Sequence, residues 1–142
     1  MTEPIPADRI EIQDLLAAYA FAFDCGRPDE WAATFTPDGE FHNRSGEVFK
    51  GTEQLRAFAA SFAAPDDITR TNQHWTTNVT LTPLDDNRMA LRCYGMIITT
   101  TADGTPRIRS MTGYDDEVRR IGGRWRFARR RVAGWPMSPS IG

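Results

Sequence analysis

The chain has few of the residues on which covalent cross-links and metal sites depend. It contains two cysteines, Cys25 and Cys93, and two histidines, His42 and His74. Two cysteines are too few for a disulfide framework, and two distant histidines without a cysteine pair do not have zinc-ligand spacing. A glycine-rich phosphate loop and a Gly-x-Ser-x-Gly elbow are also missing. We therefore predict no metal and no cofactor, and chemistry that depends on acid and base side chains.

The sequence also lacks an excess of positive charge and any long apolar run. Its 17 basic and 19 acidic residues leave a formal net charge of -2, which gives no electrostatic basis for binding nucleic acid. No apolar run approaches the ~18 residues of a membrane span, and the N-terminus does not resemble a signal peptide. The sequence thus predicts a cytoplasmic protein with reduced thiols and with no nucleic-acid or membrane partner.

What the chain does contain is enough apolar surface for one folded domain. Hydrophobic residues make up 40% of it, including 8 Phe and 4 Trp, and a chain of this length buries roughly two thirds of its unfolded surface. No linker, internal repeat or low-complexity tract interrupts it. We therefore predict a single domain over residues 1–142, of which residues 136–142 form a loose tail.

The N-terminal half has the periodicity of helices. Apolar side chains in the first segment recur at i, i+3, i+4 and i+7, the spacing of a one-sided helix; they are Ile12, Leu15, Leu16, Tyr19, Ala20 and Phe23. Gly26 is suited to end this helix, Pro28 to begin a second and Thr52 to cap a third. The pattern predicts helices at residues 8–25, 28–35 and 52–62, with short strands at 40–43 and 47–50.

The C-terminal half has the pattern of an antiparallel sheet. Four β-rich segments are separated by short breaks rich in Asp and Gly, which are typical of hairpins; they cover residues 71–83, 88–101, 106–120 and 124–134. Helices followed by antiparallel strands indicate an α+β fold. The sheet must bury one face against the first helix, and long strands that curl around a helix leave a hollow between them.

Asp24 lies in an unusual place for a carboxylate. It falls in the last turn of the first predicted helix, where the backbone carbonyls already make the local field negative. At ~100° per residue it lies about 40° around the helix from Ala20, at the edge of the apolar stripe. Asp24 therefore points either into water or into a pocket whose chemistry needs a carboxylate.

Several motifs, in this order and spacing, resemble the SnoaL-like branch of the nuclear-transport-factor-two-like superfamily along nearly the whole chain. They are YAFAFDCGRPDEWAATFTPDGEF, the glycine of FKGTEQL, QHWTTNVTL and TGYDDEVRRIGGRWRFARRRV. The resemblance implies a cone-shaped, curved antiparallel sheet packed against three N-terminal helices, with one deep pocket. The superfamily includes dehydratases, dehydrochlorinases, isomerases, polyketide cyclases and non-catalytic modules, so the fold alone does not decide the function.

The resemblance implies a role for Asp24 and His74. In scytalone dehydratase and hexachlorocyclohexane dehydrochlorinase, an acid at the end of the first helix and a histidine on the first long strand form a dyad, and these two residues occupy the same places. A neutral imidazole can take a proton from carbon when a carboxylate orients it and stabilises the imidazolium. We therefore predict Asp24 and His74 as catalytic residues, with a carboxylate oxygen within roughly 2.6–3.2 Å of a ring nitrogen.

Tyrosines and arginines are the candidates for holding the substrate. Tyr19 lies on the apolar stripe and Tyr114 on the third long strand, and either phenol could contact a substrate oxygen. Alternation along the last strand puts Arg129 and Arg131 on its apolar face, where one of them could bind an anion. A β-bulge in that strand would reverse the assignment.

These observations together predict a cofactor-independent, dehydratase-like lyase or isomerase that acts on a small apolar cyclic or aromatic molecule and forms a homodimer or homotrimer. Two alternatives stay open, namely a non-catalytic small-molecule-binding protein and the small subunit of a ring-hydroxylating dioxygenase. Alternation from His74 also leaves Trp75, Val79 and Leu81 on the outer face of the sheet. That apolar face indicates either a dimer interface or a bulge before Val79.

Overall fold

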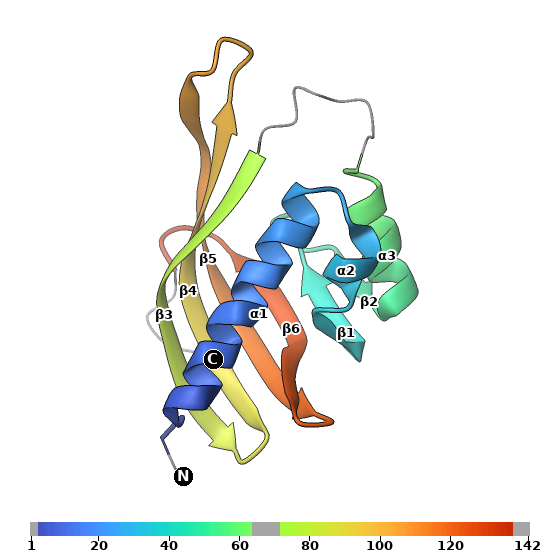
Figure 1. Cartoon of the computed structure of the whole chain (residues 1–142), viewed down its shortest axis with the longest axis vertical. Coiled ribbons are helices and arrows are strands. Elements are labelled where there is room, and N and C mark those ends of the chain that lie inside the picture. The colour runs from blue at the N-terminus through green and yellow to red at the C-terminus, as the bar shows by residue number, and fades with distance from the viewer. Residues whose placement is uncertain (1–2, 64–71, 138–142) are drawn as a thin grey trace.

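The computed structural model describes residues 3–63 and 72–137, and shows three helices packed on the concave side of one curved sheet (Figure 1). The helices are α1 (Pro6–Asp24), α2 (Pro28–Ala32) and α3 (Thr52–Ala60). The strands are β1 (Phe35–His42), β2 (Val48–Lys50), β3 (Asn72–Asp85), β4 (Arg88–Thr100), β5 (Pro106–Ile121) and β6 (Arg124–Ala133).

The sheet has six strands in the order β2-β1-β6-β5-β4-β3. The long strands β3 to β6 pair as antiparallel neighbours, and β1 joins β6 in parallel. This is the α+β architecture predicted from the sequence. Residue 71, at the start of the predicted strand 71–83, lies outside the described residues. None of the described helices has both the length and the apolar character that a bilayer crossing requires.

Helix α1 lies across the sheet, and its C-terminal end lies beside the beginning of β3 (Figure 1). One side of the helix is buried, as the periodicity predicts, through Ile12, Leu15, Leu16, Tyr19 and Ala22. Phe23 is only half-buried, and its ring contacts those of Phe58 and Phe62 in and just after α3. The last turn of α1 therefore borders a space between helices and sheet instead of the closed core.

The centre of the core is the ring of Trp31, which is fully buried. Its ring centroid lies 5.0 Å from that of Phe35 and 5.5 Å from that of Phe41. The prediction that the second helix continues to residue 35 was wrong, because Thr34 closes the helix by donating both its backbone N–H and its hydroxyl to the carbonyl of Trp31. Phe35 then pairs with Phe127 of β6 as the first residue of β1.

The predicted cap of the third helix also differs from the structure. Gly51, with φ +83°, occupies the N-cap position, and Thr52 is the first helical residue without a side-chain capping bond. A positive φ of this kind is readily adopted by glycine. The backbone N–H of Lys50 is instead bonded by the side chain of Gln54, at 2.9 Å.

A β-bulge in β3 decides which of its side chains face the helices. Pairing with β4 shifts between Thr77 and Thr80, and Asn78 adopts φ +58°. Beyond this point alternation is reversed, so Val79 and Leu81 pack against the core. Of the two explanations for an apolar outer face, the bulge before Val79 is confirmed.

A second bulge, in β6, overturns the predicted facing of its arginines. Glu117 of β5 pairs with Arg129, but the next residue, Val118, pairs with Phe127. Ala128 is therefore an extra residue in β6. Arg130 consequently faces the core and is completely buried. The prediction that Arg129 and Arg131 lie on the apolar face was wrong, because alternation does not continue through a bulge.

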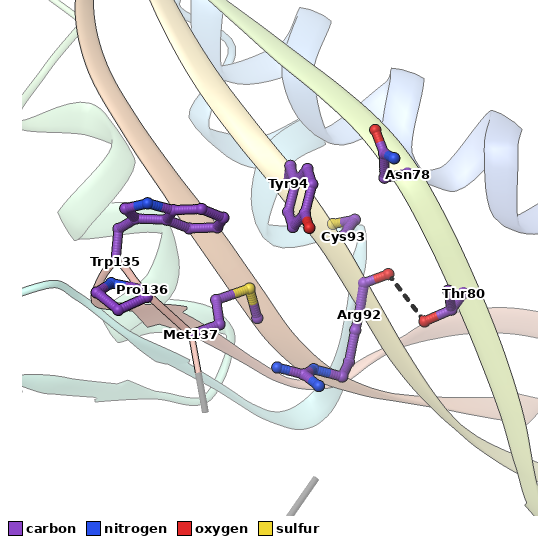
Figure 2. Close-up of a pocket in the computed structure, with 8 residues that line it drawn as sticks. All are labelled: Asn78, Thr80, Arg92, Cys93, Tyr94, Trp135, Pro136 and Met137. Atoms are coloured by element: carbon purple, nitrogen blue, oxygen red, sulfur yellow. Dashed lines mark hydrogen bonds between the residues drawn. The ribbon is translucent and has the colours of Figure 1, made fainter. Parts of the chain in front are cut away.

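The end of the described chain packs on the outer face of the sheet. Trp135, Pro136 and Met137 border a hollow of about 380 Å³ beside Tyr94 (Figure 2). The rings of Tyr94 and Trp135 meet edge to face at 5.3 Å, and Met137 occupies the space that a side chain at Gly113 would need. Residues 136–137 of the predicted loose tail are thus held against the sheet, and residues 138–142 lie outside the described chain.

Candidate functional site

Asp24 and His74 meet where the end of α1 reaches the beginning of β3. Oδ1 of Asp24 lies 2.5 Å from Nδ1 of His74, and Oδ2 accepts a 2.8 Å hydrogen bond from the backbone N–H of His74. The two side chains are only 15% and 17% exposed, respectively. The contact is slightly shorter than the predicted range of roughly 2.6–3.2 Å. Two donors from β3 thus explain why the last turn of α1 carries a carboxylate.

This arrangement assigns the proton on the imidazole. A carboxylate can only accept hydrogen bonds, so Nδ1 carries the hydrogen that points at Asp24. Nε2 is then the basic nitrogen, and none of the described residues forms a hydrogen bond to it. The ring of Phe23 stands edge-on to the imidazole, with centroids 5.3 Å apart, and helps to hold the plane of the ring. His74 therefore presents one free lone pair in a defined direction.

His74 lies on the wall of a cavity of about 760 Å³ between α1, α3 and the sheet. Most of the wall is aromatic or aliphatic, through Tyr19, Phe23, Phe41, Phe58, Phe62, Ile97, Tyr114 and Val132. A volume of this size accommodates a small ring compound. The structure thus brings Tyr19 and Tyr114, two of the predicted substrate-binding residues, to the same cavity as His74.

The other part of the wall is polar, and none of the described residues in it carries a carboxylate. It consists of Arg44, Asn72, His74, Thr99, Arg109, Ser110 and Thr112. Across residues 3–63 and 72–137, no three His, Cys, Asp or Glu side chains come together in the manner of a metal site.

Arg130 lies behind the two tyrosines, and its guanidinium group forms cation–π contacts with both rings. Its guanidinium carbon is 4.3 Å from the ring centroid of Tyr19 and 3.8 Å from that of Tyr114. Its Nε lies 3.6 Å from Oδ2 of Asp116, and neither side chain is more than 1% exposed. Burial raises the pKa of both phenols, although Arg130 opposes the shift. Tyr19 and Tyr114 therefore stay protonated and can donate a hydrogen bond to a ligand.

Two arginines that the sequence did not single out line the cavity, and one of them is placed there by a third bulge. The β4–β5 register passes from Ile97 opposite Ser110 to Ile98 opposite Ile108, which leaves Arg109 as the extra residue. A bulge can turn the extra side chain to the face of its neighbour, and Arg109 and Ser110 do line the cavity together. No sequence signal marks this bulge.

Arg44 reaches the cavity from the turn that follows β1. Its Nη2 donates to the hydroxyl of Ser110 at 3.0 Å and to the carbonyl of Met111 at 3.1 Å. These partners are on β5, far away in the sequence, so only the folded chain shows the direction of the side chain.

Arg129 and Arg131, which were predicted to bind substrate, do not line this cavity. Arg131 forms an ion pair with Asp115 on the outer face, where Asp115 also accepts a 2.8 Å hydrogen bond from Arg92. Arg129 pairs in register with Glu117, two residues along β5 from Asp115 and therefore on the same face of the sheet. Arg130, the buried arginine between them, is nearer to the cavity, but the rings of Tyr19 and Tyr114 separate it from the substrate-binding space.

Comparison with known proteins agrees with this fold. The model of the SnoaL-like domain matches residues 6–131. Aln2 from a Streptomyces species is 25% identical, with a TM-score of 0.84, and 94% of each chain is covered. A Catenulispora acidiphila protein in complex with S-DNPA is 27% identical, with a TM-score of 0.77 over 89% of this chain and 92% of that one. A Mycobacterium tuberculosis protein of unknown function is 28% identical, with a TM-score of 0.79 over 96% and 82%. No curated protein sequence matches the chain.

Proposed function

We propose that this chain, which belongs to the SnoaL-like domain family, is a cofactor-independent lyase or isomerase that moves a proton on a small cyclic molecule. In this proposal His74 is the base and Asp24 is its orienting partner. The observation that carries the proposal is the way His74 is held. Both oxygens of Asp24 bind it, while Nε2 has no hydrogen-bond partner among the described residues and the ring lies on the wall of an aromatic cavity.

The chemistry begins when the Nε2 lone pair takes a proton from a carbon beside a carbonyl group. The electrons of the broken C–H bond then move to the carbonyl oxygen, which becomes an enolate oxygen. A protonated phenol of Tyr19 or Tyr114 can stabilise that charge through a hydrogen bond, and Asp24 stabilises the imidazolium. The proton then returns to a different carbon, which is an isomerisation, or to a departing hydroxyl group, which leaves as water. Neither route needs an oxidant or a reductant.

The nature of the cavity supports a ring compound as the substrate. Six aromatic rings contribute to its wall, and its volume of about 760 Å³ suits a molecule of one to a few fused rings. The Catenulispora acidiphila relative holds S-DNPA, which supports small-molecule binding by this kind of fold.

Hydrogen–deuterium exchange tests the proposal without knowledge of the natural substrate. Cyclic ketones and hydroxyketones of one to three rings are incubated with the protein in D₂O, and loss of the proton beside the carbonyl is followed by NMR. Asp24→Asn and His74→Gln should each lower the catalysed rate on the order of 10²–10⁴-fold. The double variant should lose little more than either single variant, because the two residues act as one unit.

The chain contains a matched control for these variants. His42 and Glu40 form another histidine–carboxylate pair, with Nε2 and Oε2 3.3 Å apart, and neither lines the cavity. His42→Gln and Glu40→Gln should keep the wild-type rate. Losses that add in the double variant of Asp24 and His74 would show that these residues act separately. Ketones that bind without exchange or elimination would instead identify a non-catalytic binding protein.

A further inference from the structure

The cavity is lined by two cationic side chains in addition to its aromatic wall, and these are Arg44 and Arg109. We infer that the site selects a ring compound that also bears an anionic group, such as a carboxylate. The anion binds to the two guanidinium groups, and the ring lies against the aromatic wall near His74. The inference rests on the proposed function for the chemistry that follows, whereas the binding itself can be measured alone.

The charges of Arg44 and Arg109 are not neutralised by the residues that the structure describes. Arg44 donates through Nη2 to two neutral acceptors, a hydroxyl and a carbonyl oxygen. Neither guanidinium takes part in any of the ion pairs that the described residues form. Both groups can therefore donate to an incoming carboxylate, and arginine matches the planar geometry of that group.

The rest of the cavity wall does not offset this positive charge. No aspartate or glutamate is among the described residues that line it, and the nearby carboxylate of Asp24 is already engaged by two donors from His74. A concave surface with charges of one sign attracts a ligand of the other sign. Among the described residues of the cavity, an anionic ligand therefore meets only positive and neutral groups.

The position of Arg109 comes from the backbone and not from a flexible side chain alone. Arg109 is the extra residue of the β4–β5 bulge, so it lines the cavity beside Ser110. Arg107, two residues earlier on the same strand, is exposed as Arg109 is, but it does not line the cavity. The strand thus provides two arginines of equal chemistry, of which one belongs to the site.

The aromatic part of the wall favours a ring system as the body of the ligand. The rings of Phe23, Phe58 and Phe62 form one continuous surface, with neighbouring centroids 5.1–6.2 Å apart. A ring system on this surface removes apolar area from water, while the guanidinium groups keep the anion at the polar part of the wall. The favoured ligand therefore has a ring body and one acidic side arm.

Calorimetry with two ligands of equal shape tests this inference. Naphthalene-2-acetate carries the anion, naphthalene-2-acetamide lacks it, and neither undergoes turnover. Wild-type protein at low ionic strength should bind the acetate on the order of tenfold more tightly, because each of the two partly exposed ion pairs makes a modest favourable contribution. Added salt should weaken binding of the acetate and leave that of the acetamide unchanged.

Single substitutions locate the preference. Arg44→Gln and Arg109→Gln should each reduce the preference for the acetate, and the double variant should abolish it, with the affinity for the acetamide unchanged. Arg107→Gln should behave as wild type. Equal affinity of wild-type protein for both ligands, no binding of either, or equal losses in Arg107→Gln and Arg109→Gln would each overturn the inference. Because binding is measured without turnover, failed deuterium exchange with a clear acetate preference would reject only the proposed function.

Discussion

Replacing Asn78 with valine tests the backbone conformation on which the facing of β3 depends. Asn78 has φ +58°, in the left-handed region where asparagine is tolerated but a β-branched residue is strongly disfavoured. Its side chain forms no hydrogen bond with another described residue, so the substitution removes no such bond. The effect of Asn78→Val should therefore come from the backbone alone.

The expected loss follows from the cost of holding such a residue in this region, which is roughly 1–3 kcal/mol. This is a sizeable part of the total stability of about 5–15 kcal/mol that is typical of a domain. With a urea m-value of about 1–3 kcal/mol/M, a loss of ~2 kcal/mol lowers the unfolding midpoint by about 1 M. Urea titration with tryptophan fluorescence would measure the shift.

Two further variants separate backbone from side chain. Asn78→Gly should change the free energy of unfolding by less than about 1 kcal/mol, because glycine adopts a positive φ freely but loses more entropy on folding. Thr77→Val, one residue earlier in extended backbone, should change it by less than about 0.5 kcal/mol. If Asn78→Val costs no more than Thr77→Val, or if Asn78→Gly costs as much as Asn78→Val, backbone strain is not the cause.

Two other predictions concern buried ionisable groups. Cys25 is exposed, whereas burial raises the pKa of the Cys93 thiol to about 12; a disulfide reagent should therefore titrate one thiol in the native protein and both in denaturant. Burial raises the pKa of Asp116 from 3.8 to about 7, and Arg130 opposes this shift. The contribution of Asp116 to stability is therefore present below about pH 4 and is lost as the pH rises to about 7. Relative to Asp116→Asn, the unfolding free energy of the wild type should fall across that interval by at most about 1.4 kcal/mol per pH unit, and parallel curves for the two proteins would contradict the shift.

The parts of the fold that could be predicted are those in which burial leaves a regular pattern. The apolar period of residues 8–25 reports one buried side, and it indicated α1 to within two residues at the start and one at the end. The contact between Asp24 and His74 is different, because nothing local joins the two residues. It could be predicted only from the resemblance to proteins that have an acid and a histidine in the same two places.

The parts that could not be predicted lie at or after a bulge, or in a turn. Three arginines in succession at 129–131 give no apolar signal to show which one faces inward, and the bulge in β6 selects Arg130. The same limit hid Arg109, while the direction of Arg44 depends on acceptors on a distant strand. In β1, the run TPDGEF has the composition of a turn, yet it forms a kinked strand because β6 supplies partners on both sides of the kink.

The bulge in β6 also has a consequence for sequence alignment across the family. Because the bulge accommodates one residue more than its neighbour requires, a chain that lacks the residue equivalent to Ala128 would still turn its Phe127 and Arg130 equivalents inward. Length variation by one residue at this point is therefore compatible with the same core, although the middle of a strand ordinarily excludes gaps. An alignment that allows no gap there would match the buried arginine of such a relative to the outward-facing Arg129 of this chain. A gap at position 128 restores the equivalence.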